Sequence, residues 1–489
     1  MKRIAVPFAA VDSAKPFVAS VGYFNFAWIG GIANKPAEVF AVLSFIIGSL
    51  LIAATPPLRG PDESQHFLRA YGIAQGDIFP ATTDTRGRKG LLLPSDFAAD
   101  FRFFDVLSGE PVKNFRDVMA DYERHKAEQN GRMRNDALVF RPYSGSEGYS
   151  PMAYLPQTLT AFAAQTIGLD FLNTIYLMRL SGLVALTAIL TWAITQAPCL
   201  RWAFVAIPML PAAIYGRSVI NADGAALAST MVVTVLCLRA AFGLKDPPGR
   251  RAVWMAICAL TKPPQLAFVA LEAMCRPLRG LPQNWRAMML VALPAAIAAL
   301  LWSSLSSSDV AAWRLTELTG ISTQQFDPVW KLGFMLREPL HFPLAALATM
   351  ADAGELWRQL IGVLGLFDTM LQLWTYPVIT LLVLATCIVP IALPAATRLR
   401  IAGAAGLTAA LYGFGILLIF YLVWTPIDAE KIWGVQGRYF LPVLPGLAIM
   451  IAAAVKRSPP PQMQAVLAIS AALLSGGAAL ESILRVDWN

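Results

Sequence analysis

The chain has 489 residues, of which 56% are hydrophobic and 14% are charged. Soluble domains carry about 25% charged residues, so this composition excludes a soluble globular protein and predicts a polytopic membrane protein. The formal charge of +8 comes from 39 Lys and Arg against 31 Asp and Glu. Because this excess is spread over short loops, we expect no nucleic-acid partner.

The chain opens with two apolar stretches. Residues 1–36 are expected to form a cytoplasmic or interfacial segment without a cleaved signal peptide, in which residues 16–33 either lie in the membrane interface or span. Residues 37–56 hold one charge near their start and then none. At about 1.5 Å per residue they are long enough to cross a hydrocarbon core of about 30 Å. We therefore predict the first transmembrane helix at residues 37–56.

A cluster of ionisable residues follows this helix directly. It consists of Arg59, Asp62, Glu63, His66 and Arg69. Ionisable side chains at the point where a transmembrane helix leaves the membrane are costly to place, so they usually have charge partners or a functional role. Spacings of three to four residues place Asp62, His66 and Arg69 on one helical face. The alternative is that Asp62 caps a surface helix beginning at Glu63. A cap explains only Asp62, so we favour a functional site.

The long polar segment after this helix is expected to form an outer, periplasmic loop at residues 57–171, with juxtamembrane helices. If the first span runs from the cytoplasm outward, this loop lies outside, and the topology of the rest of the chain then depends on whether residues 151–168 cross the membrane. If they crossed, the basic residues Arg239, Lys245, Arg250 and Arg251 would lie outside, against the positive-inside rule. We therefore expect residues 151–168 to lie along the outer surface.

The remaining apolar runs then alternate consistently across the membrane. Transmembrane helices are expected within 172–304 and 372–489, separated by an outer loop at 305–371 whose lone Asp368 suggests a re-entrant turn. The expected spans are 172–194, 201–220, 222–242, 286–304, 372–394, 401–424, 439–455 and 463–483, with a broken segment at 252–275 around a double proline. The predicted fold is an all-α bundle of roughly nine to eleven transmembrane helices.

Further polar residues fall at the outer ends of these spans. Asp223 begins one span, and Gly437-Arg438-Tyr439 opens a helix that enters the membrane. Helix N-terminal amides, a guanidinium and a phenol suit an anion. The alternative is that Arg438 is a snorkelling anchor and Tyr439 an aromatic-belt residue. Because carboxylates are expected on the same side of the membrane, we favour the anion site over the interfacial anchor.

The five cysteines predict no metal site or disulfide. Cys199, Cys237, Cys258, Cys275 and Cys387 include no CxxC pair, and none lies in the long polar segment. We expect them to be small buried residues within helices.

Five motifs resemble the bacterial membrane-protein family catalogued as domain of unknown function 2142. They are PDESQHFLRAYGIAQGD at 61–77, SPMAYLPQ at 150–157, Asn-Ala-Asp at 221–223, Thr-Lys at 261–262 and VQGRYFLPVLP at 435–445. That family resembles the GT-C glycosyltransferases, which use polyprenyl-phosphate sugars outside the cytoplasmic membrane. The resemblance implies a GT-C-like bundle in the bacterial inner membrane with its active site facing the periplasm. It also implies a catalytic or metal-binding acidic residue after the first span, the place of Asp62 and Glu63.

The expected function is transfer of a sugar from polyprenyl phosphate to a cell-envelope glycan, lipid or protein. Asp62 is the expected base, with Glu63 as its alternate, and both are candidate ligands for Mg²⁺ or Mn²⁺. Arg438 is expected to hold the phosphate, and His66 to orient Asp62 or the acceptor. The expected substrate-binding set also includes Arg69, Asp223, Lys262, Gln436 and Tyr439. The expected partners are membrane lipids, the lipid-linked donor and the acceptor.

Two alternatives belong to other classes of protein. A transporter or flippase for a lipid or glycolipid places charges near the membrane midplane and often contains internal repeats. We find no repeat in this sequence, and the acidic cluster lies at a surface. A non-enzymatic envelope-assembly protein needs no Asp-Glu-His-Arg cluster.

Overall fold

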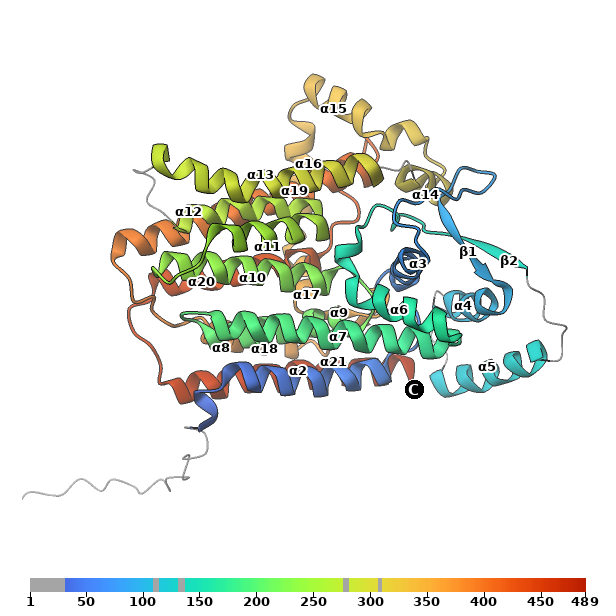
Figure 1. Cartoon of the computed structure of the whole chain (residues 1–489), viewed down its shortest axis with the longest axis horizontal. Coiled ribbons are helices and arrows are strands. Elements are labelled where there is room, and N and C mark those ends of the chain that lie inside the picture. The colour runs from blue at the N-terminus through green and yellow to red at the C-terminus, as the bar shows by residue number, and fades with distance from the viewer. Residues whose placement is uncertain (1–30, 109–113, 131–136, 276–280, 307–309) are drawn as a thin grey trace, which may run out of the picture.

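The computed structural model describes residues 31–108, 114–130, 137–275, 281–306 and 310–489. Residues 1–30, which include most of the apolar stretch 16–33 and most of the expected N-terminal segment 1–36, lie outside these residues. The protein is an all-α membrane protein, with seven described helices that are long and apolar enough to cross a membrane. They are α2 (Pro36–Ala54), α7 (Phe171–Gln196), α10 (Asp223–Ala241), α13 (Leu281–Ser306), α19 (Ala395–Trp424), the continuous stretch of η6 (Gly437–Val443) and α20 (Leu444–Ala454), and α21 (Pro461–Asp487). Figure 1 shows the long helices side by side as one bundle.

The other expected spans are built from shorter pieces. The first comprises α8 (Arg201–Ala206), η2 (Ile207–Met209) and α9 (Pro211–Ser218); the second comprises α11 (Pro248–Thr261), η3 (Pro263–Leu271) and α12 (Glu272–Cys275); the third is α18 (Thr375–Thr386). Proline removes a backbone donor and interrupts a helix, and α11 ends at Thr261, one residue before Pro263-Pro264. The expected break around the double proline is therefore present in the structure.

Small residues allow the first helix to approach its neighbours closely. A Cβ atom on Gly48 of α2 would lie 2.4 Å from a methyl carbon of Leu183 on α7, and one on Gly476 of α21 would lie 2.7 Å from Ile47. Without a hydrophobic driving force between helices in lipid, such close van der Waals packing holds them together. Helix α13, in contrast, does not bury this part of its surface against other helices. Its Leu300 and Leu301 are exposed, as expected for a helix that faces lipid.

The first polar segment folds into a small unit at one end of the bundle (Figure 1). It contains α3 (Glu63–Ala74), β1 (Gly90–Pro94), α4 (Ser95–Ser108), α5 (Phe115–Asn130), β2 (Leu138–Pro142), η1 (Pro151–Ala153) and α6 (Leu155–Ile167). The strands pair antiparallel with Gly90 opposite Pro142. Phe67, Phe97 and Phe101 pack around Phe171 at the start of α7, with ring centroids 5.3 to 6.0 Å from it. This aromatic core joins the unit to the bundle.

Helix α6 contains 13 residues, fewer than the ~20 that cross a bilayer. Its side chains Leu159, Phe162 and Ile167 are exposed. A short helix with an uncovered apolar face suits the lipid interface. These features are consistent with the expected surface placement of residues 151–168.

The second loop contains short helices and one hairpin. Its elements are α14 (Val310–Thr319), η5 (Thr323–Phe326), α15 (Pro328–Arg337), α16 (His341–Met350), α17 (Ala353–Gly362), β3 (Val363–Leu364) and β4 (Thr369–Met370). Asp368 lies in the β3–β4 hairpin, while the re-entrant placement of this turn in the membrane stays a prediction. Arg59 binds Asp368 at 2.6 Å and Asp487 at 3.0 Å. Arg59 therefore ties the first loop to the hairpin and to the end of α21.

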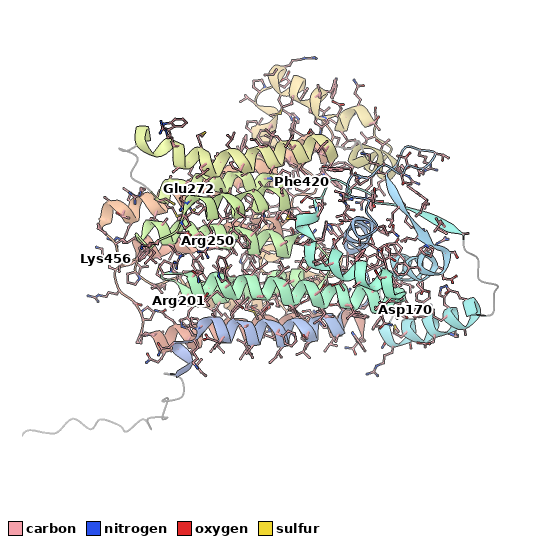
Figure 2. All side chains as sticks on the ribbon, viewed as in Figure 1. Asp170, Arg201, Arg250, Glu272, Phe420 and Lys456 are labelled. Atoms are coloured by element: carbon pink, nitrogen blue, oxygen red, sulfur yellow. The ribbon has the colours of Figure 1, made fainter. Side chains whose placement is uncertain are left out.

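Basic residues gather at the end of the bundle opposite the small unit. Figure 2 places Arg201, Arg250 and Lys456 at that end and Asp170 at the other. The positive-inside rule predicts that this end faces the cytoplasm. We expect a cysteine replacing exposed Lys456 to react with membrane-impermeant maleimide only after the cells are opened, and one replacing exposed Asp428 to react in intact cells. The five native cysteines are replaced first. The reverse pattern would invert the orientation.

Candidate functional site

Arg438, at the start of η6, brings together the two expected carboxylates. Its Nη2 lies 3.1 Å from Asp62 Oδ2, and its Nη1 lies 3.3 Å from Asp223 Oδ2. Its Nε donates to Gln436 Oε1 at 2.8 Å. Arg438 and Asp62 are 376 positions apart in the sequence. The predicted meeting of these two residues therefore occurs in the structure, and lipid does not surround Arg438, whose side chain is only 8% exposed.

Gly437 lets η6 begin against α17. A Cβ atom at this position would lie 1.9 Å from the carbonyl oxygen of Leu356 and 2.6 Å from the backbone nitrogen of Leu360. The backbone nitrogen of Gly437 donates to Gln359 Oε1 at 2.8 Å. Only glycine permits this approach, so the Gly-Arg-Tyr sequence fixes where Arg438 leaves the backbone.

Aromatic rings cover the Arg438 guanidinium. Its carbon lies 4.7 Å from the ring centroid of Phe367 and 5.2 Å from that of Tyr439. Tyr439 in turn stacks on Phe420 with centroids 5.2 Å apart. Arg stacks favourably on such faces. Phe367, in the hairpin turn, was not expected from the sequence because its contact depends on the fold of a loop.

A second cation reaches the site from the break between α11 and η3. Lys262 Nζ pairs with Asp223 Oδ1 and lies 4.9 Å from the Tyr439 ring centroid. Asp223 is held at the start of α10, where its backbone nitrogen donates to Asn221 Oδ1 at 2.9 Å. Asp223 therefore bridges Lys262 and Arg438. Two cations and two carboxylates from four separate segments meet in one cluster.

Asp62 is the most exposed member of this cluster. Its side chain is 45% exposed, against 12% for Asp223. It occupies the N-cap position of α3 but makes no capping hydrogen bond, and its φ of 52° lies in the left-handed region. This conformation costs a non-glycine residue about 1 kcal/mol and is common at functional sites. The capping alternative is therefore not what the structure shows: the carboxylate faces Arg438.

Glu63 points the other way and is fully buried. Its two oxygens accept hydrogen bonds from Arg179 at 2.8 and 2.6 Å and from the backbone nitrogens of Gly60 and Ile220 at 3.0 and 2.9 Å. Glu63 thus joins α3 to α7, and it does not share a ligand position with Asp62. The pair does not fit a divalent cation, which needs several converging oxygens. The lone Arg179 within an apolar run was the sequence signal for this ion pair.

Arg69 also has a structural place. Its guanidinium donates to the backbone oxygens of Tyr149, Asp77 and Ile78 at 2.7 to 3.0 Å. These hydrogen bonds join α3 to the segment that follows it and to the segment that precedes η1. Because the guanidinium is buried behind them, we assign Arg69 to support of the site and not to substrate contact.

His66 is buried beside the cluster. Its Nδ1 shares a hydrogen bond of 2.5 Å with the Tyr154 hydroxyl, and its ring lies edge-on to Tyr149 at 5.2 Å. Burial lowers the pKa of His66 from 6.5 to about 4, against the opposing pull of Asp62 and Asp223. The imidazole is therefore neutral at physiological pH. It can orient a hydroxyl group but supplies no charge.

We expect acid to destabilise the protein through His66. Between pH 6.5 and 4 the unfolded chain binds a proton at this residue that the folded chain does not. The free energy of unfolding therefore falls with decreasing pH in this window, by up to about 3 kcal/mol. Gln at position 66 can still bond to Tyr154 but does not titrate. Thermal unfolding in detergent should show a flatter pH profile for His66→Gln than for wild type. Parallel pH profiles of the melting temperature for the two proteins would contradict the lowered pKa of His66.

The cluster has the composition of an anion site. Arg438 Nη1 is buried and has no hydrogen-bond partner among the described residues, although it lies near Asp223. Buried donors are usually satisfied, so such an atom suggests a ligand oxygen. Guanidinium and ammonium groups together suit phosphate. The adjacent, half-exposed Asp62 supplies a carboxylate that can accept a proton.

One comparison with known proteins gives a match. The family described as "Predicted membrane protein (DUF2142)" matches residues 45–447, which include Asp62, Asp223, Lys262 and Arg438. Neither the curated proteins nor the solved structures include a match to the chain. The family description supports a membrane location and gives no activity.

Proposed function

We propose that this chain, which belongs to the DUF2142 family of predicted membrane proteins, is a glycosyltransferase that moves a sugar from a polyprenyl-phosphate donor to an acceptor hydroxyl group. The observation that carries the proposal is the cluster in which Arg438 lies beside the half-exposed Asp62 and shares Asp223 with Lys262. We place it at the periplasmic face of a bacterial inner membrane, because Arg201, Arg250 and Lys456 lie at the opposite end of the bundle (Figure 2). The acceptor is a glycan, lipid or protein of the envelope.

Donor binding uses the two cations. A phosphate oxygen accepts a hydrogen bond from Arg438 Nη1, which has no such partner among the described residues, and Lys262 binds a second oxygen. Asp223, which pairs with both cations, keeps them together before the donor arrives. As the guanidinium turns toward the phosphate, its hold on Asp62 weakens. The carboxylate is then free to accept a proton.

Transfer follows as one displacement. The acceptor hydroxyl oxygen forms a bond to the anomeric carbon, and its proton passes to Asp62. The bond from that carbon to the phosphate oxygen breaks, and its electron pair stays on the phosphate. The phosphate changes from a singly charged diester to a doubly charged monoester, so the cations bind it more strongly as the reaction proceeds. This difference lowers the barrier.

Neighbouring residues position these groups. Gln436 holds Arg438 through Nε, and neutral His66, fixed by Tyr154, is placed to orient the acceptor. Glu63 has no role in the transfer. We route no step through a divalent cation, since Asp62 and Glu63 do not converge. Assays with and without added Mg²⁺ or Mn²⁺ measure whether one contributes.

We expect Arg438→Lys to weaken donor binding. Lysine keeps the charge but loses the planar fork and the bond to Gln436. Since a hydrogen bond to a charged group contributes about 1.5–3 kcal/mol, the KM for polyprenyl-phosphate sugar should rise by roughly 10- to 100-fold, with little change in dependence on the acceptor. Arg358→Lys is the matched control, because Arg358 pairs with Glu355 at the surface of α17. An unchanged donor KM in Arg438→Lys would remove Arg438 from the phosphate site.

A further inference from the structure

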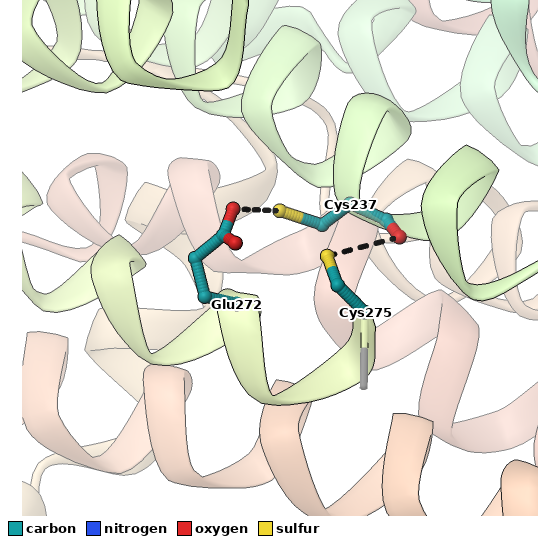
Figure 3. Close-up of side chains that lie close together, drawn as sticks. All are labelled: Cys237, Glu272 and Cys275. Atoms are coloured by element: carbon teal, nitrogen blue, oxygen red, sulfur yellow. Dashed lines mark hydrogen bonds between the residues drawn. The ribbon is translucent and has the colours of Figure 1, made fainter. Parts of the chain in front are cut away.

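A second cluster of polar side chains lies near the basic end of the bundle. Cys237 comes from the last turns of α10, while Glu272 and Cys275 come from α12 (Figure 3). The sulfur atoms and one carboxylate oxygen all lie within 4.8 Å of one another. Cys237 Sγ lies 3.7 Å from Glu272 Oε1, and Cys275 Sγ lies 3.8 Å from the backbone oxygen of Cys237. Cys237 and Glu272 are buried.

Arg251 holds the carboxylate of this cluster in place. Its Nε and Nη2 donate to the two oxygens of Glu272 at 2.6 and 3.0 Å, and its Nη1 donates to the backbone oxygen of Asp246. These two hydrogen bonds fix the orientation of the Glu272 carboxylate. Such outer partners are typical of carboxylates that bind metal ions.

We propose that Cys237, Cys275 and Glu272 bind one divalent metal ion of the zinc class. In a tetrahedral zinc site with Zn–S of about 2.3 Å and Zn–O of about 2.0 Å, sulfur and oxygen lie about 3.5 Å apart. The observed 3.7 Å between Cys237 Sγ and Glu272 Oε1 is close to that separation. Two thiol donors also favour zinc over Mg²⁺ or Ca²⁺, which prefer oxygen ligands.

The charges of the cluster select a divalent ion. Two thiolates and one carboxylate carry three negative charges, and Arg251 compensates one of them. A divalent cation neutralises the remaining two in a buried site, whereas a monovalent cation leaves one uncompensated. Binding releases the two thiol protons to solvent and involves no oxidation. A water molecule completes the fourth position.

The proposed site would fasten the two elements that carry Asp223 and Lys262. Asp223 starts α10 and Cys237 lies near its end, while Lys262 precedes the η3–α12 segment that carries Glu272 and Cys275. The ion therefore crosslinks α10 to the broken segment. Because the basic end is assigned to the cytoplasm, where thiols stay reduced, metal binding is favoured there over a disulfide. The inference is independent of the proposed sugar transfer.

The test uses the purified full chain in detergent, stripped of metal by a chelator and kept reduced. Co²⁺ is added as a spectroscopic substitute for Zn²⁺, and Zn²⁺ is then titrated against a chromophoric chelator. We expect one ion per chain, a sulfur-to-cobalt charge-transfer band, the visible spectrum of tetrahedral Co²⁺, and a higher melting temperature with Zn²⁺. Absence of the charge-transfer band in the wild type would overturn the proposal.

Variants identify the ligands. Cys275 is only partly buried, so Cys275→Ser should fold and bind Zn²⁺ at least 100-fold more weakly. Cys387→Ser replaces a buried cysteine on another part of the bundle and should bind as wild type does. Equal affinity in Cys275→Ser and Cys387→Ser would overturn the assignment. If Cys275→Ser does not fold, Cys275→Ala replaces it, with the same expected loss and the same contrary result. A Cys237–Cys275 disulfide formed in glutathione buffer would also contradict the metal site.

Discussion

Replacing Asp62 with Asn should abolish sugar transfer, with a loss of about 10²- to 10⁴-fold, the range for removal of a general base. The amide has nearly the same shape but cannot take the acceptor proton. Folding should be unaffected, because the carboxylate is 45% exposed and makes no cap bond. Asn also tolerates the left-handed backbone of this position. The measurement is the initial rate of label transfer by equal amounts of reconstituted wild type and variant.

Asp352→Asn is the matched control for this experiment. Asp352 has a side chain that is 52% exposed and pairs with Lys431, as Asp62 pairs with Arg438. It lies outside the cluster, so its variant should transfer sugar at the wild-type rate. Full activity in Asp62→Asn would remove Asp62 from the role of base.

Glu63→Gln is expected to destabilise the fold and not to act on the chemistry directly. The substitution leaves Arg179 buried without its charge partner, and both side chains are fully buried. Breaking such a pair from one side costs about 3–5 kcal/mol, a large part of the 5–15 kcal/mol that typically stabilises a protein. We expect a much lower yield of monodisperse protein and a clearly lower melting temperature in detergent.

A surface ion pair provides the comparison for Glu63→Gln. Glu355 pairs with Arg358 at 2.6 Å, the same distance as Glu63 from Arg179, but its side chain is 38% exposed. Exposed pairs contribute about 0–1 kcal/mol, so Glu355→Gln should melt almost as wild type does. An unchanged melting temperature in Glu63→Gln would show that its pair does not hold α3 to α7.

The Asp62–Arg438 contact could be predicted from sequence because it follows from topology. The placement of Lys and Arg assigns a side to every helix end, so residues at outer ends become candidates for one cluster regardless of sequence separation. The same reasoning led to Asp223 and to Lys262 at the proline break. Both lie within the Arg438 cluster in the structure.

Side-chain direction could not be predicted in the same way. Asp62 and Glu63 are adjacent, yet the first faces Arg438 and the second faces Arg179, because the left-handed backbone at Asp62 precedes the first turn of α3. Arg69 was expected to contact substrate but instead binds backbone oxygens. A hydrogen bond to a backbone oxygen leaves no residue-type signal in a sequence.

The proximity of Cys237 and Cys275 also could not be predicted from the sequence. The two residues are 38 positions apart, and neither belongs to a recognisable ligand spacing. Their approach depends on how the segment after Pro263-Pro264 returns along α10. That path includes the 3-10 helix η3 of 9 residues, and 3-10 helices longer than about three to four residues are uncommon, so the sequence pattern did not predict it.

The most direct measurement uses purified protein in proteoliposomes, a polyprenyl-phosphate sugar labelled in the sugar, and envelope glycans and lipids extracted as acceptors. We predict that wild type moves the label to an acceptor and releases an equal amount of polyprenyl phosphate, while Asp62→Asn leaves the donor intact. Two results would contradict sugar transfer at the Asp62–Arg438 cluster. In the first, wild type leaves the donor intact with every acceptor fraction. In the second, wild type and Asp62→Asn turn over the donor at equal rates.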